Sequence, residues 1–136
     1  MNPPFHRPLR RRGVTLIEMS IVILILVSLM STGLFVANKI GDWKLGREAS
    51  ETLRMVHSAQ RLYLADNPTR PVSSITNSQL IPYLPNGLTS MPTVTALDGR
   101  QLPIIVNVSP PVINGGGGEV YDPSGNPNDG LWDIGS

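Results

Sequence analysis

The sequence RRRGVTLIEMSIVILILVSLMSTGLFVA, which runs from Arg10 to Ala37, decides the fold of this chain. Three arginines precede Gly13, and no side chain from Met19 to Ala37 is charged. This run is close to the ~20 apolar residues that a helix needs to cross a bilayer. The sequence therefore predicts a membrane-spanning helix, with the arginines on the cytoplasmic side and the following chain outside.

The composition of the remaining chain limits its partners and its chemistry. The protein has 136 residues, so one small domain is left once the membrane segment and a short leader are set aside. After Gly13 the chain holds seven Lys and Arg residues against ten Asp and Glu residues, which gives no reason to expect nucleic-acid binding. There is no cysteine, so a disulfide framework and thiol catalysis are both excluded.

A secretory signal peptide and a plain membrane anchor are the two simplest interpretations of the apolar run. The run is longer than the roughly 7–15 apolar residues of a signal peptide. Phe35 also places a bulky side chain where a small-x-small cleavage site ending at Ala37 would need a small one. A plain anchor leaves Glu18 without an explanation.

Glu18 is the most informative residue of this segment. A charged carboxylate costs about 2.5–3.5 kcal/mol at the centre of a bilayer and less near its surface, and such groups usually have a partner. Cleavage after Gly13 would create an α-amino group on Val14, four residues before Glu18. That amine could pair with Glu18 of the same helix or of a neighbouring helix, and in the second case assembly would relieve the cost of the carboxylate.

Residues 10–19, Arg-Arg-Arg-Gly followed by Val-Thr-Leu-Ile-Glu-Met, resemble the prepilin signature of type IV pilins and type II secretion pseudopilins. The resemblance implies that a membrane prepilin peptidase cuts between Gly13 and Val14 and N-methylates Val14. It assigns a role in assembly to Glu18 and its neighbours Thr15, Leu16 and Ile17. The chain departs from the family at Val14, where phenylalanine is usual, and at Phe35, near which many members have a proline.

After Ala37 the sequence becomes amphipathic and stays helical. Apolar or small side chains recur at steps of three and four, which predicts one buried helix face: Leu45, Ala49, Leu53, Val56, Ala59 or Gln60, and Tyr63. The helix should end at Asp66, because Asn67-Pro68 cannot continue it.

The rest of the chain predicts short elements. We expect a loop over 69–74, a short helix from Thr76 or Asn77 to about Tyr83 with Leu80, Ile81 and Leu84 facing inward, and a turn over 85–87. Strands 93–97 and 100–108 flank Asp98-Gly99, a strong hairpin signal, with an edge or bulge expected at Pro103. A flexible link over 114–118 and a last strand pair, 119–121 with 131–134, complete the expectation.

The predicted class is α+β, and the resemblance implies a pilin-like fold. The expected parts are a leader peptide over 1–13, a transmembrane half-helix over 14–38, an amphipathic half-helix over 39–66, and a small globular domain over 67–136 that contains a short helix and an antiparallel sheet.

The last loop is the one candidate metal site. It offers oxygen ligands of the kind that calcium prefers: Asp122, Asn126, Asn128, Asp129 and Asp133. Some major pseudopilins bind calcium in a C-terminal loop. The same residue types are ordinary turn formers, so turn formation is the favoured interpretation, calcium the alternative, and no other cofactor is expected.

The sequence gives no support for an enzyme, because its histidines are His6 in the leader and His57 on the helix. The resemblance implies a structural filament subunit, processed by prepilin peptidase in a bacterial inner membrane. An assembly platform would polymerise it with itself and related subunits, its C-terminal domain being periplasmic or extracellular. Small size and lack of cysteine favour a type II secretion pseudopilin. The alternatives are a major or minor type IV pilin for adhesion, motility or DNA uptake, and a plain membrane-anchored binding domain.

Overall fold

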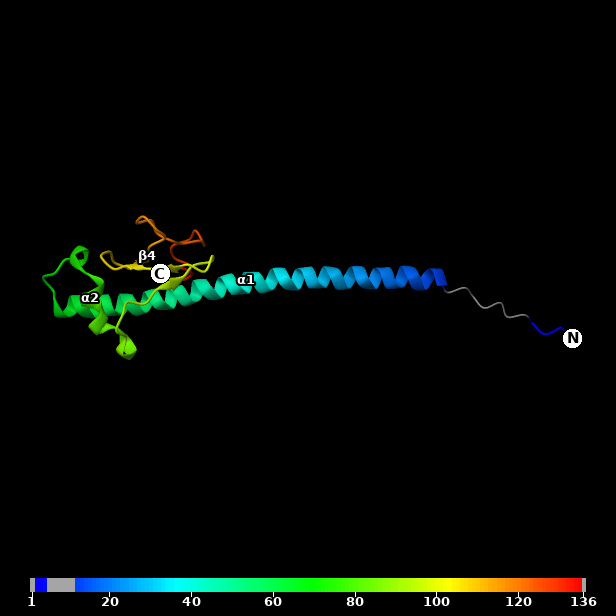
Figure 1. Ribbon diagram of the computed structural model, residues 1–136, viewed down its shortest axis with the longest axis horizontal. Coiled ribbons are helices and arrows are strands. Elements are labelled where there is room, and N and C mark those ends of the chain that lie inside the picture. The colour runs from blue at the N-terminus through cyan, green and yellow to red at the C-terminus, as the bar shows by residue number, and fades with distance from the viewer. Residues whose placement is uncertain (1, 5–11, 136) are drawn as a thin grey trace. The chain divides into compact units, whose positions relative to one another are not determined.

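The computed structural model describes residues 2–4 and 12–135, and for residues 12–14 it describes the backbone alone. The chain forms two compact units, Met1–Lys39 and Ile40–Ser136. The long helix α1 (Arg12–Asp66) contributes to both, and two small antiparallel sheets belong to the second unit (Figure 1). The α+β layout is therefore confirmed.

The end of α1 lies where the sequence predicts it. The backbone N–H of Asn67 donates to the Tyr63 carbonyl over 2.9 Å, and the Asn67 side-chain amide donates to the same carbonyl over 3.0 Å. Pro68 has no N–H with which to continue this series. The last helical residue, Asp66, accepts a 2.8 Å hydrogen bond from the Tyr83 hydroxyl, and this bond raises the pKa of Tyr83.

The core of the second unit forms along one face of α1. All the predicted stripe residues from Ala49 to Tyr63 are buried, and Leu45 is half-buried against them. Leu53 and Val56 have no exposed surface, and burying a side chain of this size contributes about 1.5–3 kcal/mol. The facing residues come from the short helices, the strands and the last loop: Ile75, Leu80, Leu84, Val94, Ala96, Leu102, Ile104, Val106, Ile113 and Trp132.

Gln60 is a polar member of this buried face. Its side-chain amide donates 2.8 Å hydrogen bonds to the carbonyls of Val106 and Val108. These bonds satisfy two backbone acceptors that have no strand partner in the described structure. A buried polar group is stable only with such partners, so Gln60 fixes the 106–108 segment to the helix.

Short helices follow α1. The expected loop over 69–74 contains a 3₁₀ turn, η1 (Val72–Ser74). The next helix, α2 (Asn77–Leu80), has Thr76 as its N-cap, and the Thr76 backbone N–H donates to the Gln79 side chain. The expected continuation to Tyr83 is a separate 3₁₀ turn, η2 (Ile81–Tyr83), and η3 (Pro85–Gly87) forms the predicted turn. Leu80 and Leu84 are buried, whereas Ile81 is half-buried.

The hairpin at Asp98-Gly99 forms as predicted. β1 (Val94–Thr95) pairs antiparallel with β2 (Gln101–Leu102), and Val94 lies opposite Leu102. Gly99 adopts a φ of 85°, which glycine reaches without strain. The Asp98 carboxylate accepts the Arg100 backbone N–H and contacts its guanidinium at 2.6 Å, which lowers the pKa of Asp98.

The single strand expected over 100–108 is wrong, because Pro103 divides it. β3 (Ile104–Ile105) leaves the hairpin and pairs instead with β4 (Val112–Ile113). A proline lacks the N–H that a continuous ladder needs, while the Pro103 carbonyl accepts the Asn114 N–H over 2.9 Å. Alternating burial holds through Val106 but fails at Val108, whose side chain is 41% exposed.

The expected last strand pair is also wrong. In the described chain, Val120 forms an isolated antiparallel bridge with Asn114, residues 131–133 form bends, and Ile134 has no regular secondary structure. The 131–134 segment bonds to α1 instead: the Trp132 N–H donates to the Gly46 carbonyl over 3.1 Å, and Arg54 Nε donates to the Ile134 carbonyl over 3.1 Å. The 114–118 link is an ordered turn, because Asn114 Oδ1 accepts the N–H groups of Gly116 and Gly118.

The contact of Trp132 with α1 requires a glycine at position 46. A Cβ atom there would lie 2.8 Å from Trp132 Nε1, whereas a Cβ at Gly41 would meet no atom within 4 Å. We expect Gly46→Ala to lower the free energy of unfolding by about 1–3 kcal/mol through overpacking. The matched Gly41→Ala should be neutral or stabilising by up to about 1 kcal/mol through helix propensity.

The measurement is thermal unfolding of the full chain in detergent micelles, followed by near-UV circular dichroism, to which Trp132 contributes. Equal stability of the two alanine variants would contradict the packing of Trp132 on Gly46.

Candidate functional site

The predicted processing and assembly residues lie in the first turns of α1. Gly13 and Val14 are helical, and the structure describes only their backbone. Leu16 and Ile17 are 72% and 64% exposed, and Glu18 is exposed as well. Because residues four apart share a helix face, the backbone of α1 places position 14 one turn before the Glu18 carboxylate.

Apolar side chains surround α1 in the first unit. Every described side chain from Thr15 to Lys39 is exposed. By length and composition, α1 is the one described helix that could span a membrane. A helix that is apolar on all sides is typical of a buried or a membrane-spanning segment.

The hydroxyl groups of this segment are satisfied within the helix. Ser20 donates to the Leu16 carbonyl over 2.8 Å, and the remaining bonds also reach back four residues: Ser28 to Leu24, Ser31 to Val27 and Thr32 to Ser28. Since hydrocarbon offers no hydrogen bonds, internal satisfaction of this kind is a condition for burial in a bilayer. Glu18 is the one charged side chain between Val14 and Lys39.

The five predicted calcium ligands lie in the C-terminal loop, where four of them accept hydrogen bonds from the loop itself. Asp122 Oδ1 accepts the N–H and the hydroxyl of Ser124. Asn126 Oδ1 accepts the backbone N–H of Asn128, and Asp129 Oδ1 accepts that of Leu131. Asp133 Oδ1 accepts the backbone N–H groups of both Gly130 and Gly135. These are the hydrogen bonds that turn-forming Asn and Asp residues make.

Asp129 and Asp133 are brought together within this loop. The Leu131 N–H lowers the pKa of Asp129, whereas burial and the neighbouring Asp129 raise the pKa of Asp133. Asp133 Oδ2 is buried and has no hydrogen-bond partner in the described structure. Nowhere in the described residues do three or more His, Cys, Asp or Glu side chains form a metal-binding group.

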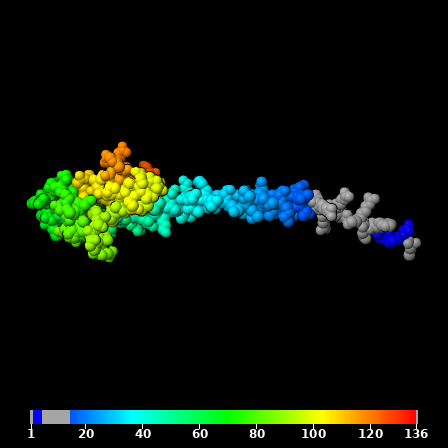
Figure 2. Space-filling model, in the orientation of Figure 1, coloured from blue at the N-terminus to red at the C-terminus, as the bar shows by residue number. Residues whose placement is uncertain are grey.

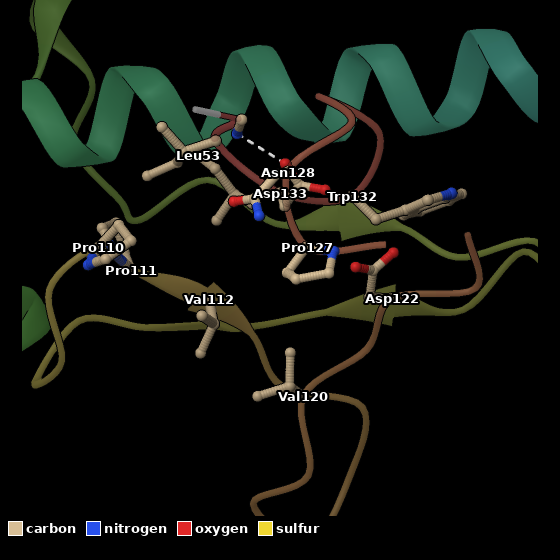
Figure 3. Close-up of a pocket in the computed structure, with 12 residues that line it drawn as sticks. Leu53, Pro110, Pro111, Val112, Val120, Asp122, Pro127, Asn128, Trp132 and Asp133 are labelled. Carbon is tan, nitrogen blue, oxygen red and sulfur yellow. Dashed lines mark hydrogen bonds between the residues drawn. The ribbon is translucent and has the colours of Figure 1, made fainter. Parts of the chain in front are cut away.

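A pocket of about 170 Å³ lies beside this loop. Figure 3 shows Leu53 of α1 on one side of it and Val120 on the other, with Pro127 and Asp133 from the loop. Its walls are mostly apolar, and Pro110, Pro111 and Trp132 contribute to them. The pocket therefore joins the helix, β4 and the C-terminal loop within the second unit.

Three residues hold this loop and the 106–108 segment to α1 through contacts that the sequence analysis did not predict. They are Gly46, Arg54 and Gln60, which contact backbone atoms or Trp132 from far along the chain. The sequence carried a weak signal for two of them, because Gly46 and Gln60 interrupt an otherwise good helical pattern. Nothing in the sequence distinguished Arg54 from the other exposed arginines.

Comparison with known proteins gives no relative for this chain: no protein-family model, curated protein or solved structure matches it.

Proposed function

We propose that this chain is a structural subunit of a type IV-like filament, of the type II secretion pseudopilin kind, and that it is not an enzyme. The observation that carries the proposal is the single carboxylate of Glu18 on the exposed part of α1 before Lys39, which has no other charged side chain after Val14. A prepilin peptidase would cut between Gly13 and Val14, and an inner-membrane assembly platform would then add the subunit to the filament. Before assembly, residues 14–38 of α1 would lie in lipid, with the N-terminus cytoplasmic and the second unit on the far side.

Assembly would exchange lipid for neighbouring helices around α1. Lipid tails are as apolar as the helix, so apolar packing alone supplies little preference for the filament. Glu18 supplies the preference for the filament over lipid, because the methylated amine of a neighbouring Val14 would neutralise the Glu18 carboxylate. Thr15, Leu16 and Ile17 lie in the same turns and would contact the neighbouring subunit.

The first test of processing is the intact mass and N-terminal residue of the protein from its native membrane. We expect a chain that begins at Val14 and is heavier by one methyl group. A chain that keeps residues 10–13, or one cut near Ala37, would return the protein to the plain anchor or the secreted class.

The test of assembly is Glu18→Ala, with Glu48→Ala as a matched control on an exposed turn of the same helix. Glu18→Ala leaves the incoming amine without a partner, and losing up to about 2.8 kcal/mol lowers the assembly constant by up to about a hundredfold. We expect processed, membrane-inserted protein that is missing from sheared, pelleted filaments. Glu48→Ala should assemble normally, and normal filaments from Glu18→Ala would refute the neutralisation argument.

We also propose calcium as a stabilising ion of the C-terminal loop, because Asp133 Oδ2 is buried without a partner beside Asp129. Those two carboxylates would hold the ion. At about ten times its Kd, calcium would stabilise the folded state by about 1.4 kcal/mol, which is about 5–10 °C in Tm for a unit of this size.

The measurement is Tm of the full chain in detergent with calcium chloride or with EDTA. Asp133→Asn should abolish the calcium shift, and Asp98→Asn, outside the loop, should keep it. An unchanged Tm for the unmodified protein would mean that turn hydrogen bonds alone hold the loop.

A further inference from the structure

The exposed face of α1 carries a shallow groove in the second unit. Ser58, Arg61, Leu62 and Ala65 line it, and its volume is about 410 Å³. Leu62 is 55% exposed although it lies one residue from the buried Tyr63. We call this surface the Leu62 groove; it combines an exposed apolar side chain with a positive charge.

A second exposed surface has the opposite charge. The turn after β4 presents Glu119 and Val120, and Val120 is 60% exposed. Asn114 Oδ1 holds this turn through the N–H groups of Gly116 and Gly118, and the Gly115 N–H donates to the Glu119 carbonyl over 2.7 Å. We call it the Val120 tip; Figure 2 shows its orange segment projecting from the yellow strands.

Charge complementarity connects the two surfaces. Residues 101–136 contain no Lys or Arg, and Glu119 is one of their four acidic side chains. Asp122, Asp129 and Asp133 accept hydrogen bonds from their own loop, whereas in the described chain the Glu119 carboxylate accepts none. Among the described residues the one ion pair joins Arg100 to Asp98, so it includes neither Arg61 nor Glu119.

The two surfaces cannot meet within one chain. Val120 and Leu53 line the same pocket, on the buried face of α1 (Figure 3). Leu62 follows Leu53 by nine residues, which is about two and a half helical turns and about 13 Å along the axis. The two side chains therefore lie on opposite sides of α1. The groove and the tip are therefore on opposite faces of the unit and are available to different neighbours.

We infer that the Leu62 groove of one copy binds the Val120 tip of a second copy, with Arg61 paired to Glu119. The tip supplies an apolar side chain for the groove, and its hydrogen-bonded turn is ordered before binding, which reduces the entropy lost on association. Because two different surfaces meet, the contact is heterologous and repeats without closing into a dimer. This inference rests on the proposed filament and identifies a contact between its second units.

The lack of cysteine in the chain makes a crosslinking test direct. The full chain carries Leu62→Cys and Val120→Cys together and is oxidised in native membranes. We expect a ladder of multimers on non-reducing gels. Each single variant should give dimers at most, and a control pair, Leu62→Cys with Leu88→Cys, should give no ladder because Leu88 lies outside both surfaces.

Charge reversal in the same cysteine pair tests the role of the ion pair. Arg61→Glu or Glu119→Arg should each slow ladder formation about tenfold through like-charge repulsion, and the two together should restore it. A ladder that is insensitive to either reversal would overturn the Arg61–Glu119 pairing.

The outcomes separate this contact from the proposed function. If filaments form and need Glu18, but the cysteine pair gives no ladder, the contact is wrong and the filament proposal stands. An intrachain disulfide, seen as a fast-migrating monomer, would also overturn the contact. So would a single crosslinked band that joins this chain to a different protein. A ladder from the Leu62→Cys and Val120→Cys pair supports the contact.

Discussion

Burial of one face of α1 is the constraint on which the second unit depends. The sheets have strands of two residues each, too short to form an independent core. Leu53 and Val56 supply a continuous apolar surface, and strands, turns and short helices all pack on it. Without the helix these segments would have no common core, so α1 serves both as the apolar N-terminal segment and as the scaffold of the folded unit.

The connections between this scaffold and its covering segments are largely hydrogen bonds to backbone carbonyls. Gln60 binds the carbonyls of Val106 and Val108, Arg54 binds that of Ile134, and the Gly46 carbonyl accepts the Trp132 N–H. Segments that are interrupted by proline and glycine cannot satisfy their polar groups in long ladders. Side chains and backbone of the helix replace the missing strands, which explains how a loop-rich unit remains ordered.

The same helix combines two opposite electrostatic situations. In the first unit a single carboxylate, Glu18, lies among apolar side chains, so one compensating charge has a large effect. In the second unit charges are frequent and exposed, and a pair such as Arg61 with Glu119 gains strength only when a neighbour excludes water. The proposed filament would use the first to drive insertion of a subunit and the second to set the contact between neighbouring copies.

Local sequence determined the elements whose cause is local. The apolar run, the helix end before Pro68 and the hairpin at Asp98-Gly99 follow from hydropathy, a missing N–H and a glycine turn. Glu18 was likewise visible from its charge within the apolar run, whereas Thr15, Leu16 and Ile17 were named only because of the resemblance to the pilin family. The roles of all four residues remain predictions. Tertiary structure alone decided that Pro103 sends β3 to a different partner and that Trp132 packs on Gly46. Those choices depend on which distant backbone groups and cavities are available. The residue pattern marked Pro103 as a break but could not specify the distant partner of β3 or of Gly46.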